Sequence, residues 1–126
     1  MMNKEFIPYE EALAMKELGF NEKCLTYYFE DGTFSDAVEE DEMAYCGDIR
    51  FLNHRNSYEE NVSAPLYQQV FRWFRKNHDI CSWVDKDKHG FSFMLYNRDY
   101  TTTIKDTYEE AELACLKKLI EIVKSK

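Results

Sequence analysis

The sequence contains little glycine and proline and no long hydrophobic run. Four glycines and two prolines in 126 residues leave little room for a glycine-rich phosphate loop. Nowhere do about 18 apolar residues follow one another, and the first residues form no apolar stretch. We therefore expect neither a transmembrane span nor a secretory signal, and we expect a cytoplasmic protein with no membrane partner.

Motifs of catalysis and metal binding are equally scarce. The cysteines Cys24, Cys46, Cys81 and Cys115 lie far apart with no Cys-x-x-Cys pair, which favours reduced thiols over disulfides or a zinc site. Cys24, Cys81 and Cys115 are expected to be small core residues. A dyad of Cys46 with His54 stays an open alternative, because catalytic partners can be distant in sequence. We predict no catalytic residue, no metal and no cofactor.

The composition is that of a packed globule with an uneven charge. It is 44% hydrophobic and 16% aromatic, and its length suits a single domain over residues 1–126. The net charge is −8: residues 1–49 hold 3 Lys or Arg against 13 Asp or Glu, and residues 50–126 hold 13 against 11. This acidic balance opposes general binding to nucleic acid or to anionic membranes.

Helix-end chemistry explains why Tyr-Glu-Glu-Ala occurs twice. Thr107 and Glu110 form a capping box before a C-terminal helix, and Pro8 suits the first turn of an N-terminal helix that Gly19 ends. The flanking residues do not match, so we interpret the repeat as two helix starts. A third helix is predicted in "SAPLYQQVFRWFRKNH", beginning at Ser63 or Ala64.

Two segments are typical of β-hairpins. "CLTYYFEDGTF" has β-favouring aromatics before an Asp31-Gly32 pair, and "RDYTTTIKD" could add one strand after the second hairpin. The order α-β-β-α-β-β(-β)-α predicts an α+β protein, with an antiparallel sheet of four to five strands packed by three helices. The second hairpin turns at Gly90, and its two strands have Ile80, Ser82, Val84 and Phe91, Phe93, Leu95 on alternating positions.

Two charged features could have a function, although solvated surface is the simpler reading of both. One is an acidic run in the middle of the chain, and the other is the basic rear of the helix near residue 70. If both belong to an interaction surface, its residues are Glu39, Glu40, Asp41, Glu42, Arg72, Arg75 and Lys76.

Two further features of the sequence contain carboxylates. "DKDKHGFSFMLY" begins like a calcium loop but has Tyr96 where a bidentate Glu should stand, so we interpret it as a charged turn. Glu112 falls in the middle of the apolar arc of the last helix, where a carboxylate is costly unless it is paired. We expect Glu112 to lie at the fringe and reach water or an Arg; the alternative is a functional acid.

Two resemblances bear on function. The α-β-β-β-α order of residues 64–124 resembles the double-stranded-RNA-binding domain, but "TYEEAE" stands where that family has a Lys-rich motif. "FIPYEEALAMKELGF", "APLYQQVFRWFRKNH" and "YEEAELACLKKLIEIVK" resemble a family of small uncharacterised proteins of gut Bacteroidetes, their mobile elements and phages. That resemblance implies a soluble intracellular protein and supplies no catalytic residues.

These observations favour a non-enzymatic protein-binding or regulatory module. Twenty aromatic residues exceed what one small core needs, and tyrosine suits interfaces that are partly exposed to water. The alternative is a nucleic-acid-associated factor using the basic rear of the middle helix, and an enzyme of unknown class comes third. The partner is expected to be another protein or, in a homodimer, a second copy that covers the wide apolar stripe of the last helix.

Overall fold

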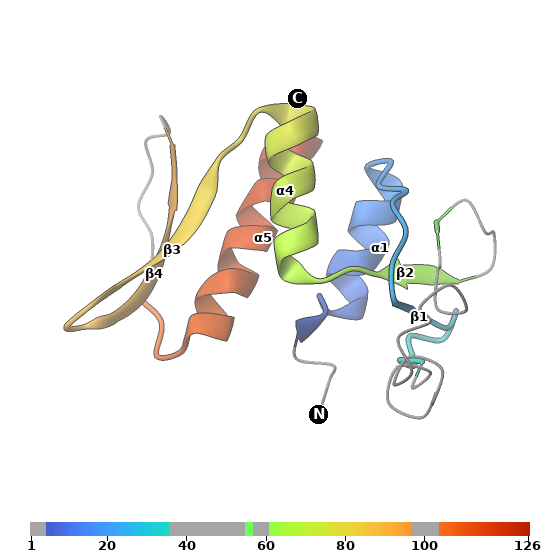
Figure 1. Ribbon diagram of the computed structural model, residues 1–126, viewed down its shortest axis with the longest axis horizontal. Helices are drawn as coiled ribbons and strands as arrows, with labels where there is room; N and C mark the ends of the chain where they lie inside the picture. The colour runs from blue at the N-terminus through green and yellow to red at the C-terminus, as the bar shows by residue number, and fades with distance from the viewer. Residues whose placement is uncertain (1–4, 36–54, 57–60, 97–103) are drawn as a thin grey trace. The chain divides into compact units, whose positions relative to one another are not determined.

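A computed structural model describes residues 5–35, 55–56, 61–96 and 104–126, and these belong to two compact units, Met1–Leu66 and Tyr67–Lys126. The elements follow the order α1, β1, β2, α4, β3, β4, α5 (Figure 1). The α+β class is confirmed. The prediction of one sheet with four to five strands is wrong, because the described strands form two separate two-stranded antiparallel sheets. The single domain stays a prediction.

In the first unit, helix α1 (Tyr9–Glu17) has the ends that the sequence predicts. Pro8 precedes it in an extended conformation, and Leu18 caps its C-terminus. Gly19 then takes a φ of 97°, which is the left-handed conformation that glycine adopts readily. The backbone N–H of Phe20 returns to the carbonyl of Met15 at 3.0 Å, and this bond closes the helix.

The strands of the first unit pair across a long stretch of sequence. Strand β1 (Thr26–Tyr28) lies antiparallel to β2 (Val62–Ala64). The predicted turn at Asp31-Gly32 is present: Asp31 Oδ1 accepts from the N–H of Thr33 at 2.9 Å, and Gly32 has a φ of 88°. The prediction of a full strand directly after this turn is wrong for the described residues, where the pairing is one bridge between Tyr28 and Phe34. Two backbone bonds flank it, from Phe29 N to Thr33 O at 2.8 Å and from Ser35 N to Tyr27 O at 2.9 Å. Local hairpin chemistry could not reveal that β2 is the true ladder partner of β1.

Tyr28 holds the core of the first unit together. Its hydroxyl donates to the carbonyl of Ile7 at 2.6 Å, and its ring meets those of Tyr9 and Phe34 edge to face, at centroid distances of 5.5 and 5.3 Å. Burial raises the pKa of Tyr28 to about 12, and the nearby charge of Glu11 adds to the rise. The phenol therefore remains a hydrogen-bond donor at all ordinary pH values.

The second unit opens with helix α4 (Tyr67–His78). The prediction that this helix begins at Ser63 or Ala64 is wrong, since both residues belong to β2. The extended pairing continues past β2, because the N–H of Ile7 donates to the carbonyl of Pro65 at 3.0 Å. The helix therefore begins only after this extended segment ends. The amphipathic face is confirmed, and its buried residues are Tyr67, Val70, Phe71, Trp73 and Phe74.

Strands β3 (Ser82–Asp87) and β4 (Gly90–Leu95) form the predicted second hairpin. Asp87 Oδ1 accepts from the backbone N–H groups of His89 at 2.7 Å and Gly90 at 3.2 Å. The aspartate thus serves the turn, as the charged-turn interpretation expects. Of the extra strand proposed for "RDYTTTIKD", the described residues show a single bridge between Phe91 and Lys105.

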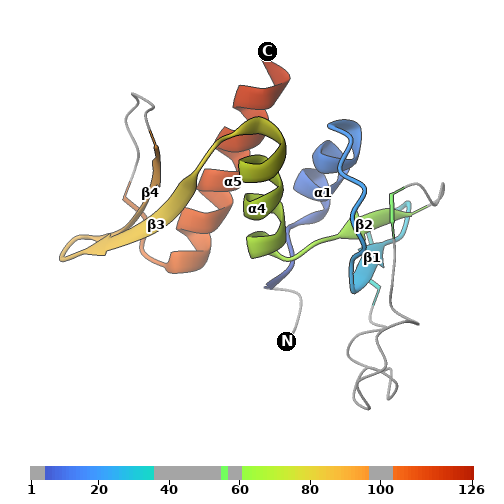
Figure 2. The ribbon, with the colours of Figure 1, turned by 45° about the horizontal axis from the view of Figure 1, so that its top comes forward.

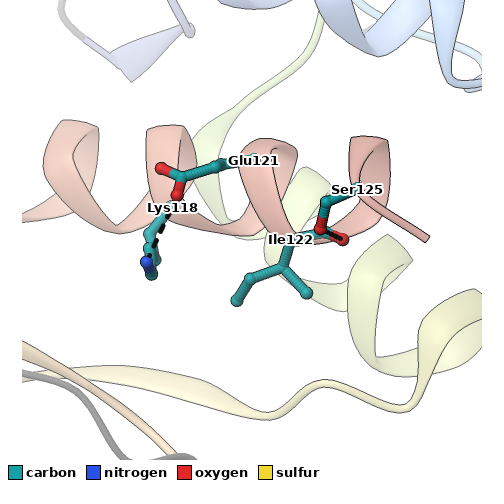
Figure 3. Close-up of polar contacts among 4 residues, drawn as sticks. All are labelled: Lys118, Glu121, Ile122 and Ser125. Atoms are coloured by element: carbon teal, nitrogen blue, oxygen red, sulfur yellow. Dashed lines mark hydrogen bonds and ion pairs between the residues drawn. The ribbon is translucent and has the colours of Figure 1, made fainter.

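Helix α5 (Tyr108–Lys124) packs on β3 and β4 and against α4 (Figures 1 and 2). Thr107 Oγ1 accepts from the N–H of Glu110 at 3.1 Å, which confirms the predicted cap. At the other end Ser125 Oγ donates to the carbonyl of Ile122 at 2.9 Å, one turn from an exposed Lys118–Glu121 ion pair (Figure 3). The buried face comprises Ala111, Glu112, Cys115, Leu116, Leu119 and Ile120.

The chain buries most of the apolar stripe of α5, while Leu113, Ile122 and Val123 are half-buried. The homodimer stays a prediction. Among the described residues, no helix is both long and apolar enough to cross a membrane.

Candidate functional site

The β3–β4 hairpin has one covered face and one open face. Val84 lies opposite Phe93 and Ser82 opposite Leu95, and these positions face inward, where Phe93 and Leu95 are buried. Alternation then places Trp83 and its cross-strand partner Met94 on the outer face. Trp83 is 46% exposed and Met94 is 39% exposed. An aromatic–thioether pair of this size usually packs against something, so its exposure marks a candidate surface.

Two neighbours extend this surface by one more cross-strand position. Tyr96 N donates to the carbonyl of Cys81 at 3.0 Å, which continues the ladder beyond the strands. Tyr96 is 64% exposed, and Cys81 is an exposed free thiol. The prediction that Cys81 is a core residue is wrong, because it shares the outward parity of Trp83. We call Cys81, Trp83, Met94 and Tyr96 the hairpin outer face.

A small hollow lies beside the beginning of β3. Its volume is about 160 Å³, below the roughly 300 Å³ at which pockets for drug-sized ligands begin. An engineered cavity of about 150 Å³ binds benzene, so this hollow has room for about one ring or one apolar side chain. Its walls come from α4, β3 and the start of α5, through Gln68, Phe71, Ser82, Trp83, Val84 and Tyr108.

Polar groups lie beneath the hairpin on the α5 side. Glu112 is only 8% exposed, so the expectation that it lies at the fringe is wrong. Burial raises the pKa of Cys115 to about 12; the negative charge of Glu112 adds to the rise, and the Ser82 hydroxyl partly offsets it.

Burial makes the Cys115 thiol a poor nucleophile. A thiol acts as a nucleophile only as the thiolate, and the raised pKa keeps Cys115 protonated at neutral pH. The pKa of Tyr108 is also raised, first by burial and then by the charges of Glu112, Cys115 and Glu109. No group of three His, Cys, Asp or Glu side chains in the described part of the chain could hold a metal ion. Cys46 and His54 lie outside the described residues.

The predicted interaction residues divide into two groups. Arg72, Arg75 and Lys76 are exposed on α4, as the sequence predicts. The acidic run Glu39–Glu42 lies outside the described residues, so nothing in the structure brings it to the basic residues. Sequence reasoning missed the hairpin outer face. The alternation that directs Ser82 and Val84 to one face directs Trp83 to the other, but it does not say whether that second face is covered.

Comparison with known proteins adds no family to this description. No family model matches the chain, and no curated protein or solved structure matches it either.

Proposed function

We propose that the chain is a non-enzymatic protein-binding module that acts in the cytoplasm and binds its partner through the hairpin outer face. The observation that carries this proposal is the exposed cross-strand pair of Trp83 and Met94, extended by Tyr96. Tryptophan, tyrosine and methionine are enriched at protein interfaces, and tryptophan and tyrosine are frequent hot spots. Free thiols at Cys24, Cys81 and Cys115 support a reducing compartment.

Nucleic-acid binding is the second candidate function, and one observation favours it. Arg72, Arg75 and Lys76 are exposed on a helix that has no acidic residue. However, three positive charges on one helix are few for a polyanion, and the net charge of the chain is −8. The basic residues therefore suit a short acidic segment of a protein better than a nucleic acid.

Affinity capture from host cells tests the proposed function. The bait is the full chain, compared with the double variant Trp83→Ser/Tyr96→Ser. Leu13→Ser is the matched control, because Leu13 is also an exposed large apolar residue but lies on α1. Loss of two hot-spot aromatics should weaken retention of a partner protein at least about tenfold, while the control retains it.

Two outcomes contradict the proposal. A partner that the double variant holds as well as the wild type does not bind the hairpin outer face. Retention that disappears with nuclease, and that falls steeply with salt, supports the nucleic-acid alternative instead.

A further inference from the structure

Among the described residues, no strand pairs with the outer edge of β3. The bond from Tyr96 N to the carbonyl of Cys81 fixes the phase of the ladder, so Cys81, Trp83 and Asp85 direct their backbone groups toward β4. Ser82 and Val84 therefore direct theirs away from it, and in the described part of the chain β3 pairs with β4 alone.

The opposite edge of the hairpin differs. There Phe91 and Lys105 exchange two backbone hydrogen bonds, at 2.9 and 2.7 Å. The outer edge of β3 is therefore the edge to which a further strand can be added.

Charge along β3 limits where another strand could pair. Natural edge strands resist pairing through charged side chains, and the second half of β3, Asp85–Asp87, has three of them in succession. The first half, Ser82–Val84, has none. The unprotected stretch of the edge is thus short and lies at the end of β3 that borders the hollow.

The hollow fits the side-chain pattern of an added strand. In an extended segment every second side chain points to the same face, and the covered face of this sheet leads to the walls formed by Gln68, Phe71 and Tyr108. One apolar side chain of the segment would fill the hollow. The side chains directly before and after it would lie on the outer face, next to Trp83.

Charge on α4 indicates the composition of the segment. Gln68 lines the hollow, and Arg72 and Arg75 follow it at one and two helical turns on the same side of α4. Both arginines are exposed, as is Lys76. A segment that leaves the hollow along α4 therefore meets positive charge, and acidic residues complement it.

We propose that the free edge of β3 receives an extended, acidic segment of a partner protein as an additional strand, with one apolar side chain of that segment in the hollow. This proposal rests on the proposed function and names its mode, which is β-strand addition. A second copy of the chain is the less suitable occupant. Twofold pairing of two β3 strands would place both α4 helices on the same face of the joined sheet, where their arginines repel each other.

The test uses linear peptides selected from a random display library on the full chain. We expect the selected peptides to be acidic and to share one apolar residue within a stretch that binds in an extended conformation. On adding a selected peptide, hydrogen exchange at the amides of Ser82 and Val84 should slow at least about tenfold. The Trp83 amide is the internal control, because it already bonds to β4 and should change little.

Two variants separate backbone pairing from other contacts. Val84→Pro removes the outward N–H without removing a bond of the β3–β4 ladder, and should weaken peptide binding at least about tenfold. Val84→Ala keeps the N–H and should weaken it less. Arg72→Glu/Arg75→Glu should also weaken binding, and should reduce its dependence on salt. The exchange measurement on the wild type stands even if Val84→Pro fails to fold.

Several results would overturn strand addition while leaving the proposed function to its own test. One is a peptide that binds without slowing exchange at Ser82 and Val84. Another is a library that yields no binding peptide, although host-cell capture retains a partner through Trp83. A third is a mass of twice 15.1 kDa in light scattering that Val84→Pro halves, since the edge would then hold a second copy.

Discussion

A Cβ atom at Gly90 would lie 2.5 Å from the carbonyl oxygen of Lys105, closer than real Cβ contacts allow. The same atom would lie 2.8 Å from Ile104 Cγ2, and the backbone at Gly90 has a φ of 142°. Gly90→Ala should therefore break the bridge between Phe91 and Lys105. We expect it to lower the free energy of unfolding by about 2 kcal/mol or more in urea denaturation.

Gly19→Ala is the matched control for this prediction. Gly19 also has a positive φ, of 97°, but a Cβ there meets nothing within 4 Å. Only the backbone conformation is then strained, and we expect a loss of about 1 kcal/mol. Equal losses for the two variants would show that the approach of Lys105 to Gly90 contributes nothing.

The second prediction concerns the cap of α5. Thr107 Oγ1 accepts from the N–H of Glu110 and donates to Glu110 Oε1, both at 3.1 Å. Thr107→Ala removes both bonds and should lower the free energy of unfolding by about 1 kcal/mol, whereas Thr107→Ser keeps the hydroxyl and should stay within a few tenths. Helix signal in circular dichroism during urea denaturation measures both. A Ser variant as unstable as the Ala variant would contradict the role of the hydroxyl.

Local chemistry predicted the ends of α1, the cap of α5 and the second hairpin, because these depend on neighbouring residues. It placed the start of α4 too early, at Ser63 or Ala64. Thr107 caps α5, Gly19 ends α1, and Gly90 opens β4, each in the place where the sequence indicates it. The long-range pairing of β1 with β2 could not be predicted in this way. Thr26 pairs with Ala64, and no residue near either one in the sequence indicates this pairing.

The candidate site shows the same division. The exposure of Arg72, Arg75 and Lys76 follows from helical periodicity. The exposure of Trp83 does not follow from its type, because tryptophan is usually mostly buried. Whether one or both faces of a hairpin are covered depends on how many helices pack on it, and a period of two cannot decide that. The prediction that Glu112 lies at the fringe was wrong for a related reason. Periodicity gives the direction of its side chain on the helix, but not how deeply that side of the helix is buried.

The third prediction concerns thiol reactivity. Cys81 is exposed, while Cys24 and Cys115 are buried, and burial raises the pKa of Cys115. Iodoacetamide at neutral pH should therefore modify Cys81 at least about tenfold faster than Cys115 in the folded protein, as peptide mass spectrometry can measure. In urea the two should react alike. Fast modification of Cys115 in the folded chain would contradict its place beneath the hairpin.

The last prediction concerns stability at alkaline pH. The folded pKa is about 12 for Tyr28, whose ordinary value is 10.0, and about 12 for Cys115, whose ordinary value is 9.0. Above these ordinary values the unfolded chain loses the protons and the folded chain keeps them, so the unfolded state binds fewer protons. The free energy of unfolding should therefore be unaffected by these groups below about pH 9 and fall as pH rises from there toward 12.

Tyr28→Phe tests this sign directly. The variant loses the hydrogen bond to Ile7 O, so it should be less stable than the wild type at pH 8 by about 1 kcal/mol. Above pH 10 its stability should decline less steeply, because one titrating group has been removed. Thr107→Ala is the control: it should lose a similar amount at pH 8 and then follow the wild-type slope. Parallel slopes for wild type and Tyr28→Phe in urea denaturation between pH 10 and 11 would contradict the burial of the Tyr28 phenol as the source of alkaline instability.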